Sequence, residues 1–152
     1  MITYQIEQLP DIIEDIKRLG PIHWAEVSPF RDVRPFNPNW ELYLDQYRKG
    51  GVFSFTARDG NELVGYCFFT FITMSHYKHI TLAINDTLYL KPEYRKGMTG
   101  YKLITKAEEE VKKLNVQEIM WRTKLGDSNF GKLLERLGYF PEEVSYTKMV
   151  NI

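Results

Sequence analysis

The sequence is poor in cysteine and has no excess of charge of either sign. Cys67 is the only cysteine among 152 residues. An intrachain disulfide is therefore impossible, and a metal site built from thiolates is not expected. Twenty Lys and Arg residues balance twenty Asp and Glu residues. This balance gives no reason to expect nucleic acid or a membrane surface as a general partner.

Long apolar runs are missing too. No segment is apolar for long enough to span a membrane. The first ten residues, MITYQIEQLP, lack the basic start and apolar block of a secretory signal. No two histidines have metal-ligand spacing with a third donor, so we predict no metal site. Together with the lone cysteine, these absences lead us to expect a cytoplasmic protein without a membrane partner.

Aromatic residues, in contrast, are frequent. The chain has ten Tyr, nine Phe and three Trp residues, more than a small core needs, so we expect some of them to line a pocket. Apolar residues make up 43% of the chain and charged residues 26%, as is typical of a globular protein. The length and the lack of any linker predict a single domain over residues 1–152.

The first quarter of the chain predicts a strand, a helix and an irregular stretch. Alternating apolar residues predict the strand at 2–8. A helix follows from Pro10, and we expect Gly20-Pro21 to end or kink it. Residues 22–39 contain three prolines, so we expect them to be irregular, with room for one helical turn. This stretch is either a substrate-side loop or a surface connection, and its aromatic part, Phe30 to Trp40, hints at a shaped pocket.

The remaining pattern alternates strands with helices. The apolar residues at 63–73 occupy both faces, so we expect this strand to be central and covered on both sides. The path from strand 79–90 through a helix to strand 117–123 implies a parallel crossover. We therefore predict an α+β fold with a mixed, mostly antiparallel, twisted sheet and helices on both faces. The predicted elements are a helix from Trp40 to about Tyr47, strands at 52–58, 63–73 and 79–90, a helix at 99–114, a strand at 117–123, a helix from Asp127 or Ser128 to Gly138, and a final strand at 144–150.

The stretch from Asp86 to Leu103 carries the most specific functional signal. It reads as the end of a strand, a basic glycine-bearing turn and the start of a helix. Amides in the first turn of a helix have no internal partners, and the helix dipole adds positive charge, so such a turn can hold phosphate. The turn RKGMTG, at 95–100, supplies two cations and two glycines. The alternative interpretation is an ordinary helix start with surface lysines.

Two segments in order resemble the signatures of one family. The segment LYLKPEYRKGMTGYKLI, at 88–104, resembles the acetyl-CoA signature of the GNAT family of N-acetyltransferases. The run Leu134 to Tyr139, together with Asn129, resembles the second signature of that family. The predicted element order is similar to the family fold along the whole chain. The residues that match the first signature in register are Leu88, Leu90, Pro92, Glu93, Tyr94, Arg95, Gly100, Leu103 and Ile104.

The resemblance implies a cofactor, a reaction and a set of binding residues. The strands that end at Leu90 and begin at Gln117 would splay apart, and the pantetheine arm of acetyl-CoA would lie in the gap. An acetyl group would then pass directly to a primary amine of a small molecule or a peptide. The alternative is a non-catalytic GNAT-like module that binds CoA or a protein. Exposed strand edges leave a homodimer open. The residues implied for the cofactor are Leu88, Tyr89 and Leu90 for the pantetheine amides, Arg95, Lys96, Gly97, Met98, Thr99 and Gly100 for the pyrophosphate, and Asn129 for the pantetheine arm.

Two departures from the family pattern favour the non-catalytic alternative. Met98 stands where the pattern has its first glycine, and Gly97 comes one place early. The turn has therefore either shifted by a residue or lost phosphate contacts. The tyrosine that serves many members as general acid aligns near Leu134, which leaves Tyr139 and Tyr146 as the tyrosines nearby.

Asp86 is the candidate general base. If its strand alternates regularly, Asp86 is the only carboxylate on the apolar face that includes Ile84 and Leu88, a setting that suits proton transfer. The alternative is a bulge at Asn85-Asp86 that turns the carboxylate outward. The further candidates are His23 as a base, Trp24 and Glu26 as substrate contacts, His76 and His79 as other histidines, and Cys67 as a core residue rather than a nucleophile.

Overall fold

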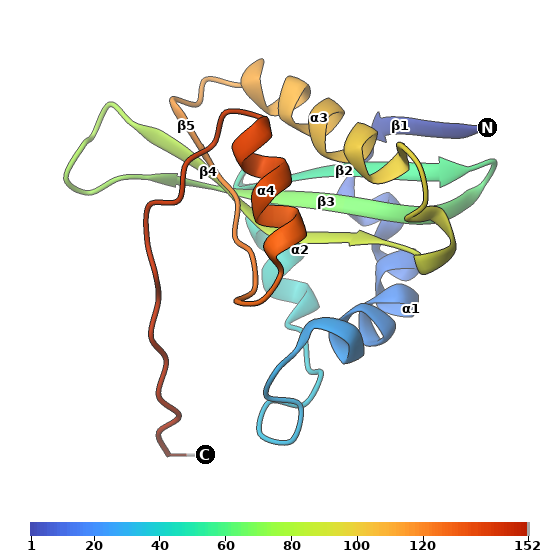
Figure 1. Cartoon of the computed structure of the whole chain (residues 1–152), viewed down its shortest axis with the longest axis horizontal. Helices are drawn as coiled ribbons and strands as arrows, with labels where there is room; N and C mark the ends of the chain where they lie inside the picture. The colour runs from blue at the N-terminus through green and yellow to red at the C-terminus, as the bar shows by residue number, and fades with distance from the viewer. Residues whose placement is uncertain (152) are drawn as a thin grey trace.

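The structure, a computed structural model, describes residues 1–151. Its strands form one sheet in the order β1-β2-β3-β4-β5, with helices on both faces (Figure 1). All neighbouring strands are antiparallel except β4 and β5, which are parallel. The predicted α+β fold with a mixed, mostly antiparallel sheet is therefore confirmed. The strands are β1 (Ile2–Ile6), β2 (Val52–Asp59), β3 (Glu62–Thr73), β4 (Thr81–Leu90) and β5 (Glu118–Met120).

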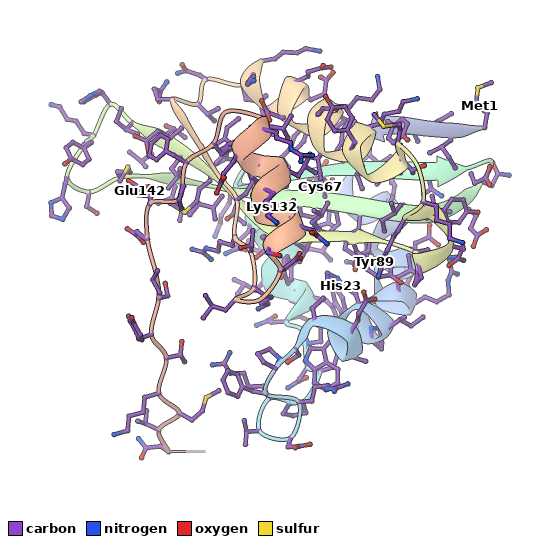
Figure 2. All side chains as sticks on the ribbon, in the orientation of Figure 1. Met1, His23, Cys67, Tyr89, Lys132 and Glu142 are labelled. Atoms are coloured by element: carbon purple, nitrogen blue, oxygen red, sulfur yellow. The ribbon has the colours of Figure 1, made fainter. Side chains whose placement is uncertain are left out.

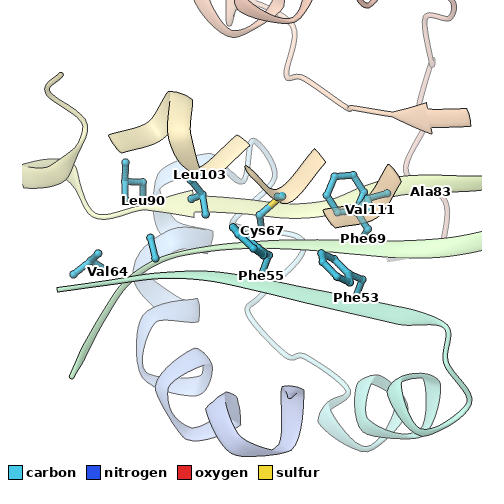
Figure 3. Close-up of a cluster of buried hydrophobic side chains, with 11 residues drawn as sticks. Phe53, Phe55, Val64, Cys67, Phe69, Ala83, Leu90, Leu103 and Val111 are labelled. Carbon is cyan, nitrogen blue, oxygen red and sulfur yellow. The ribbon is translucent and has the colours of Figure 1, made fainter. Parts of the chain in front are cut away.

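The core has two layers, one on each face of the sheet. On one face, α3 (Thr99–Lys112) covers a cluster that includes Cys67 and Phe69, as Figure 3 shows. On the other face, α1 (Leu9–Val27) and α2 (Trp40–Arg48) cover a second cluster with Phe68. β3 contributes to both clusters, so its predicted central position is confirmed. Cys67 is fully buried, as expected of a core residue.

Helix α1 is longer than the sequence predicts. It runs from Leu9 to Val27 with Pro21 inside it, so, of the end or kink predicted at Gly20-Pro21, the end is wrong. Proline in a helix removes one backbone hydrogen bond, but here the residues after it are held by other parts of the chain. His23 contacts the sheet and Glu26 pairs with the turn before α3. The irregular stretch therefore begins at residue 28 rather than 22.

The predicted final strand at 144–150 is also wrong. Figure 1 shows the chain after α4 (Ser128–Arg136) running away from the sheet, and no residue from 139 to 151 is in a helix or strand. Val144 and Tyr146 are 65% and 95% exposed. Alternation alone does not make a strand, because a strand needs an edge on which to pair. β5 spans three residues instead of the predicted 117–123 and offers little edge.

A bulge in β4 decides which side chains face which layer. Phe68 pairs with Thr87 and Phe69 pairs with Asn85, so Asp86 has no partner on β3. Ala83 before the bulge and Leu90 after it both join the cluster under α3. In a regular strand, an odd-numbered and an even-numbered residue face opposite sides. Because Ala83 and Leu90 face the same side, the bulge shifts the alternation by one residue. The common face predicted for residues 80 to 90 is therefore wrong.

Candidate functional site

The end of β4 has an open edge. β5 pairs with β4 only at Leu82–Ile84, and β4 continues to Leu90 without a strand on that side. The N–H of Lys91 donates to the carbonyl of Val64 on β3, at 2.8 Å. Because backbone groups alternate in direction along an antiparallel strand, those of Leu88 and Leu90 point toward the open edge. An extended ligand that carries amides can pair there as an added strand does.

A short turn joins this edge to α3. The 3-10 helix η1 (Pro92–Tyr94) leads to Gly97, whose φ is +78°, and Met98 is the N-cap of α3 with φ −99°. Only Gly97 occupies the left-handed region, so the residue at 98 need not be glycine. Within residues 1–151 the backbone N–H groups of Lys96, Gly97 and Met98 have no hydrogen-bond acceptor. These free donors lie at the positive end of the helix dipole, which favours an anion.

The turn is anchored by the hairpin between β2 and β3 and by β1. The hydroxyl of Tyr94 donates to Oδ2 of Asp59 at 3.1 Å, and Lys91 pairs with Glu62. The hydroxyl of Tyr4 on β1 donates to the carbonyl of Thr99 at 3.4 Å. These contacts leave the free amides of the turn unused. The turn is thus held in place by groups other than those that would bind a phosphate.

Arg95 is engaged with α1. Its Nη1 and Nη2 lie 2.5 and 2.8 Å from the two carboxylate oxygens of Glu26, and its Nε donates to the carbonyl of Leu90 at 2.7 Å. The hydrogen bonds from Arg95 lower the pKa of Glu26. The structure therefore brings two predicted residues together, but as partners of each other. Glu26 was predicted to contact the substrate by attracting a cation. In the structure its carboxylate is paired with the guanidinium of Arg95 instead.

His23 connects α1 to the sheet. Its Nδ1 lies 2.8 Å from the hydroxyl of Tyr66 on β3, and its ring packs on Tyr89 with centroids 4.9 Å apart (Figure 2). Burial lowers the pKa of His23 to about 4. The positive charge of Arg95 also lowers this pKa, whereas the carboxylate of Glu26 raises it. The imidazole is therefore neutral at pH 7. A sequence pattern does not reveal this contact, because it depends on α1 continuing past Pro21.

Asp86 lies at the bulge and is exposed. Its Oδ2 accepts a hydrogen bond from the hydroxyl of Tyr43 on α2, at 3.0 Å. The apolar surroundings expected for Asp86 are therefore absent, and the predicted alternative, a bulge that turns the carboxylate outward, is confirmed. Burial and the charge of Asp86 together raise the pKa of Tyr43. The side chain of Asp86 is in contact with solvent, on the part of β4 that has the open edge.

An apolar pocket of about 90 Å³ lies on the same face as α1 and α2. The expectation that Phe30 to Trp40 shapes a pocket is met by its second half, since Phe36, Pro38 and Trp40 line this one. The lining residues that bear a hydroxyl are Tyr43, Tyr66 and Thr87. Sequence reasoning did not identify any of them as part of a pocket. Trp40 and Tyr43 have helical spacing, which is equally typical of core residues, so no pattern separated the two roles.

Comparison with known proteins places the chain in a family. The profile of the Acetyltransferase (GNAT) family matches residues 19–139. The chain belongs to the GNAT family. No curated relative matches it.

Solved structures share the GNAT fold at low identity. An aminoglycoside acetyltransferase from an uncultured soil metagenomic sample, solved with trehalose, is 15% identical with a TM-score of 0.74, covering 99% of this chain and 96% of that one. A ribosomal-protein-alanine N-acetyltransferase from Brucella melitensis biovar Abortus 2308 is 16% identical with a TM-score of 0.70, covering 99% and 100%. An acetyltransferase from Trypanosoma brucei is 16% identical with a TM-score of 0.70, covering 99% and 100%. At these identities the likeness shows the fold alone.

Several candidate residues of this GNAT chain lie apart from the turn. His76 and His79 are exposed in the β3–β4 hairpin loop, at the opposite end of β4 from the turn. Asn129 is exposed on the first turn of α4. Among residues 1–151, no three His, Cys, Asp or Glu side chains are grouped so that they could hold a metal ion. No helix in that range is long and apolar enough to cross a membrane.

No tyrosine stands where many members of the GNAT family have their general-acid tyrosine. Leu134, which aligns near it, is a core residue with 7% exposure. The hydroxyl of Tyr139 donates to Glu108 on α3 at 2.9 Å, and burial raises the pKa of Tyr139. Tyr146 is 95% exposed on the C-terminal segment. Neither tyrosine replaces the missing one by an evident contact with the end of β4.

Proposed function

We propose that this GNAT chain transfers the acetyl group of acetyl-CoA to a primary amine of a small molecule or a peptide. The observation that supports this best is the open edge of β4 at Leu88 and Leu90, directly followed by a turn with free amides. CoA combines a pantetheine arm with two amides and a diphosphate. The first suits an unpaired strand edge, and the second suits the N–H groups of residues 96–98 at a helix N-terminus.

The residues present fit this cosubstrate. The backbone groups of Leu88 and the N–H of Leu90 would bind the pantetheine amides, whereas the Leu90 carbonyl already accepts from Arg95 Nε. Gly97, with its positive φ, lets the turn expose three successive amides. Lys96 adds a cation beside them. When bound, the acetyl thioester supplies an activated acyl group. Arg95 would reach a phosphate only by sharing or exchanging its contact with Glu26.

The proton of the amine needs an acceptor, because only a neutral amine attacks the acyl carbon. Asp86 is the favoured group, since its carboxylate is exposed at the bulge and held by Tyr43. His23 is disfavoured, because its Nδ1 is engaged with the hydroxyl of Tyr66 and its ring is packed on Tyr89. In the balanced reaction a C–N bond forms and the C–S bond breaks. The amine proton leaves through Asp86 or water, and the CoA thiolate takes a proton from water.

A thiol-release assay with acetyl-CoA and a panel of primary amines tests this proposal. Release of CoA that depends on an amine supports acetyl transfer. Calorimetric binding of acetyl-CoA without release on any amine supports instead the non-catalytic, CoA-binding module. That second candidate is favoured by the engagement of Arg95 with Glu26 and by Leu134 in place of the usual tyrosine. Absence of acetyl-CoA binding contradicts both.

Asp86→Asn tests the assignment of the base. We expect kcat to fall by roughly a hundredfold, a usual loss when a general base is removed, while acetyl-CoA affinity stays the same. Asp45→Asn is the matched control, because Asp45 is an exposed carboxylate on α2 that pairs with Lys49. If Asp86→Asn retains full kcat, water alone takes the proton and the assignment of Asp86 is wrong.

A further inference from the structure

None of the residues proposed to hold acetyl-CoA lines the apolar pocket at Thr87. We propose that it receives the apolar group of the acceptor, so that the substrate is a small primary amine bearing a branched aliphatic group or a single ring. This inference rests on the proposed acetyl transfer, because it names the acceptor class of the same reaction. The pocket lies between α1, residues 36–40, α2 and the sheet, on the face opposite α3.

The wall of the pocket is built from packed aromatic and aliphatic side chains. The ring of Phe36 lies between those of Trp24 and Trp40. Its centroid is 6.2 Å from that of Trp24 and 6.3 Å from that of Trp40. It also lies against Gly20, where a Cβ would be 2.8 Å from the tip of the ring. From α1, aliphatic side chains such as that of Ile13 complete the wall. Phe36 is therefore held in place by packing, and this part of the pocket wall is preformed.

No residue that lines the pocket carries a charge. Of its three hydroxyls, that of Tyr66 is engaged with His23 and that of Tyr43 with Asp86. A group with several ammonium ions would lose its hydration there without gaining a counter-charge. An apolar group, in contrast, gains by leaving water. The composition of the wall therefore favours an amine with an apolar group over a polycationic acceptor.

Thr87 gives the bound amine its orientation. Its Oγ1 is buried without a hydrogen-bond partner, although Thr87 lines the pocket. A buried hydroxyl without a partner costs free energy, so a ligand N–H at this point would be stabilising. Thr87 is flanked by Asp86 and by Leu88, whose backbone faces the open edge. An amine bound at Thr87 would therefore be one residue along β4 from the candidate base and one residue from Leu88.

The size of the pocket limits the apolar group. Its volume is about 90 Å³, whereas an apolar cavity of about 150 Å³ holds a benzene molecule. A branched aliphatic group fits, and a single ring fits in part, with the remainder toward the surface. Fused rings and long chains exceed the space. This predicts a preference by size as well as by polarity.

The test measures kcat/KM in the thiol-release assay with acetyl-CoA as donor. The amines are 3-methylbutylamine, 2-phenylethylamine, ethanolamine and sisomicin, which present primary amines on apolar, aromatic, polar and polycationic bodies. We expect kcat/KM for the first two to exceed that for ethanolamine by at least tenfold, a usual discrimination for an apolar pocket. A kcat/KM for sisomicin or ethanolamine equal to that for the apolar amines would overturn the proposal.

Ile13→Phe tests the position of the binding site. The larger side chain fills part of the pocket, and we expect KM for 2-phenylethylamine to rise at least tenfold, with acetyl-CoA affinity unchanged. Ile22→Phe is the matched control, because Ile22 lies on α1 but is 55% exposed. Thr87→Val is a second variant that keeps the shape while removing the hydroxyl, and it should weaken amine binding several-fold. Equal KM values in Ile13→Phe and the unmodified protein would place the acceptor elsewhere.

Calorimetry separates this inference from the proposed function. The titration adds 3-methylbutylamine to the protein saturated with CoA, which requires no turnover. Binding that Ile13→Phe abolishes supports the pocket as an amine site even if no amine releases thiol, in which case only the proposed acetyl transfer fails. Thiol release on ethanolamine and sisomicin, without binding of 3-methylbutylamine, supports acetyl transfer and overturns the apolar acceptor class.

Discussion

Arg95 and Glu26 are the residues whose partners matter most for cofactor binding. Each was predicted to face a ligand, but the two face each other across α1 and the turn. Exposed ion pairs contribute little to stability, so a diphosphate can compete for the guanidinium. Glu26 also adds a negative charge near the place where we expect that diphosphate. In the proposed cosubstrate site, diphosphate binding and the position of α1 would therefore be linked through Arg95.

We predict that Glu26→Gln tightens acetyl-CoA binding by several-fold. The substitution removes a competing carboxylate and its repulsion of phosphate, while its amide can still accept a hydrogen bond from Arg95. Calorimetric titration gives the dissociation constants. Glu14→Gln, an exposed α1 residue that pairs with Lys17, is the control and should not change them. Weaker binding in Glu26→Gln would mean that Glu26 positions Arg95 for the ligand.

His23 makes the stability of the fold sensitive to acid. Its pKa is about 4 in the folded chain, below the ordinary value of 6.5. As pH falls between these values, the unfolded chain takes up a proton that the folded chain does not, so stability is lost. We expect a loss of about 2 kcal/mol from this residue between pH 7 and pH 5. Urea unfolding at the two pH values measures it.

His23→Gln is the comparison for this prediction. Glutamine can still bond to the hydroxyl of Tyr66 but does not titrate. Glu7 and Glu26, whose pKa values are lowered mainly by their arginine partners, are present in both proteins. The difference in pH dependence therefore reports the titration of His23. Identical pH dependence in the two proteins would show that the imidazole protonates freely in the folded chain.

At the scale of elements, the turn between β4 and α3 explains why Met98 is tolerated. The positive φ belongs to Gly97, one place before the glycine of the family pattern. Of the two alternatives left by the sequence, a shifted turn matches this geometry. No packing restricts Gly97, since a Cβ there would meet nothing within 4 Å. Its role is therefore one of backbone conformation.

We predict that Gly97→Ala lowers the free energy of unfolding by about 1 kcal/mol, because an L-residue is strained at positive φ. Acetyl-CoA affinity should fall as well, since the free amides at 96–98 would shift. Denaturant unfolding and calorimetry measure the two effects. Met98→Ala is the neighbouring control with an ordinary φ, and both quantities should stay close to those of the unmodified protein. Unchanged affinity in Gly97→Ala would exclude these amides as the phosphate site.

The bulge in β4 shows how local irregularity escapes a pattern. Alternation predicted Asp86 on an apolar face, whereas the extra residue turns it outward and places Thr87 at the pocket. Asn85 supports the bulge, because its side-chain amide donates to the carbonyls of Phe68 and Thr87 at 3.1 and 3.0 Å. The bulge depends on pairing with β3, because its flanking pairs, Phe69 with Asn85 and Phe68 with Thr87, join residues 16 and 19 positions apart in the chain. Sequence alone could state it only as an alternative.

At the scale of the whole molecule, the core lies before residue 140. Residues 140–148 are all exposed, and the segment's side-chain contact with the rest of the chain is from Arg34 to Met149. We predict that removing residues 141–152 changes the free energy of unfolding by no more than about 0.5 kcal/mol, as for other surface changes. Urea unfolding measures this.

A deletion that begins at Ser128 is the comparison for this truncation. It also removes α4 and the buried Leu134, so it should cost several kcal/mol through the loss of core packing. A similar loss in the shorter truncation would show that the final segment packs on the fold in solution. Light scattering on the same samples measures whether the chain forms the homodimer that its strand edges leave open.

The fold by itself does not specify the acceptor. Proteins named for an aminoglycoside and for a ribosomal protein share it with this chain at TM-scores of 0.74 and 0.70. Such differences arise in the loops and side chains that line a site. For the acceptor pocket that we propose, those are the segment after α1, together with Tyr43 on α2 and Thr87 on β4.

The sequence by itself determined the order of most elements, the layers, the family and the location of the turn before α3. These depend on local signals such as periodicity, caps, glycines and a continuous signature, which are readable along the chain. Tertiary structure alone decided that α1 continues past Pro21, that Arg95 meets Glu26, and that Asp86 sits on a bulge beside an apolar pocket. Each of these depends on contacts between residues distant in the chain, whose packing outweighs local preference.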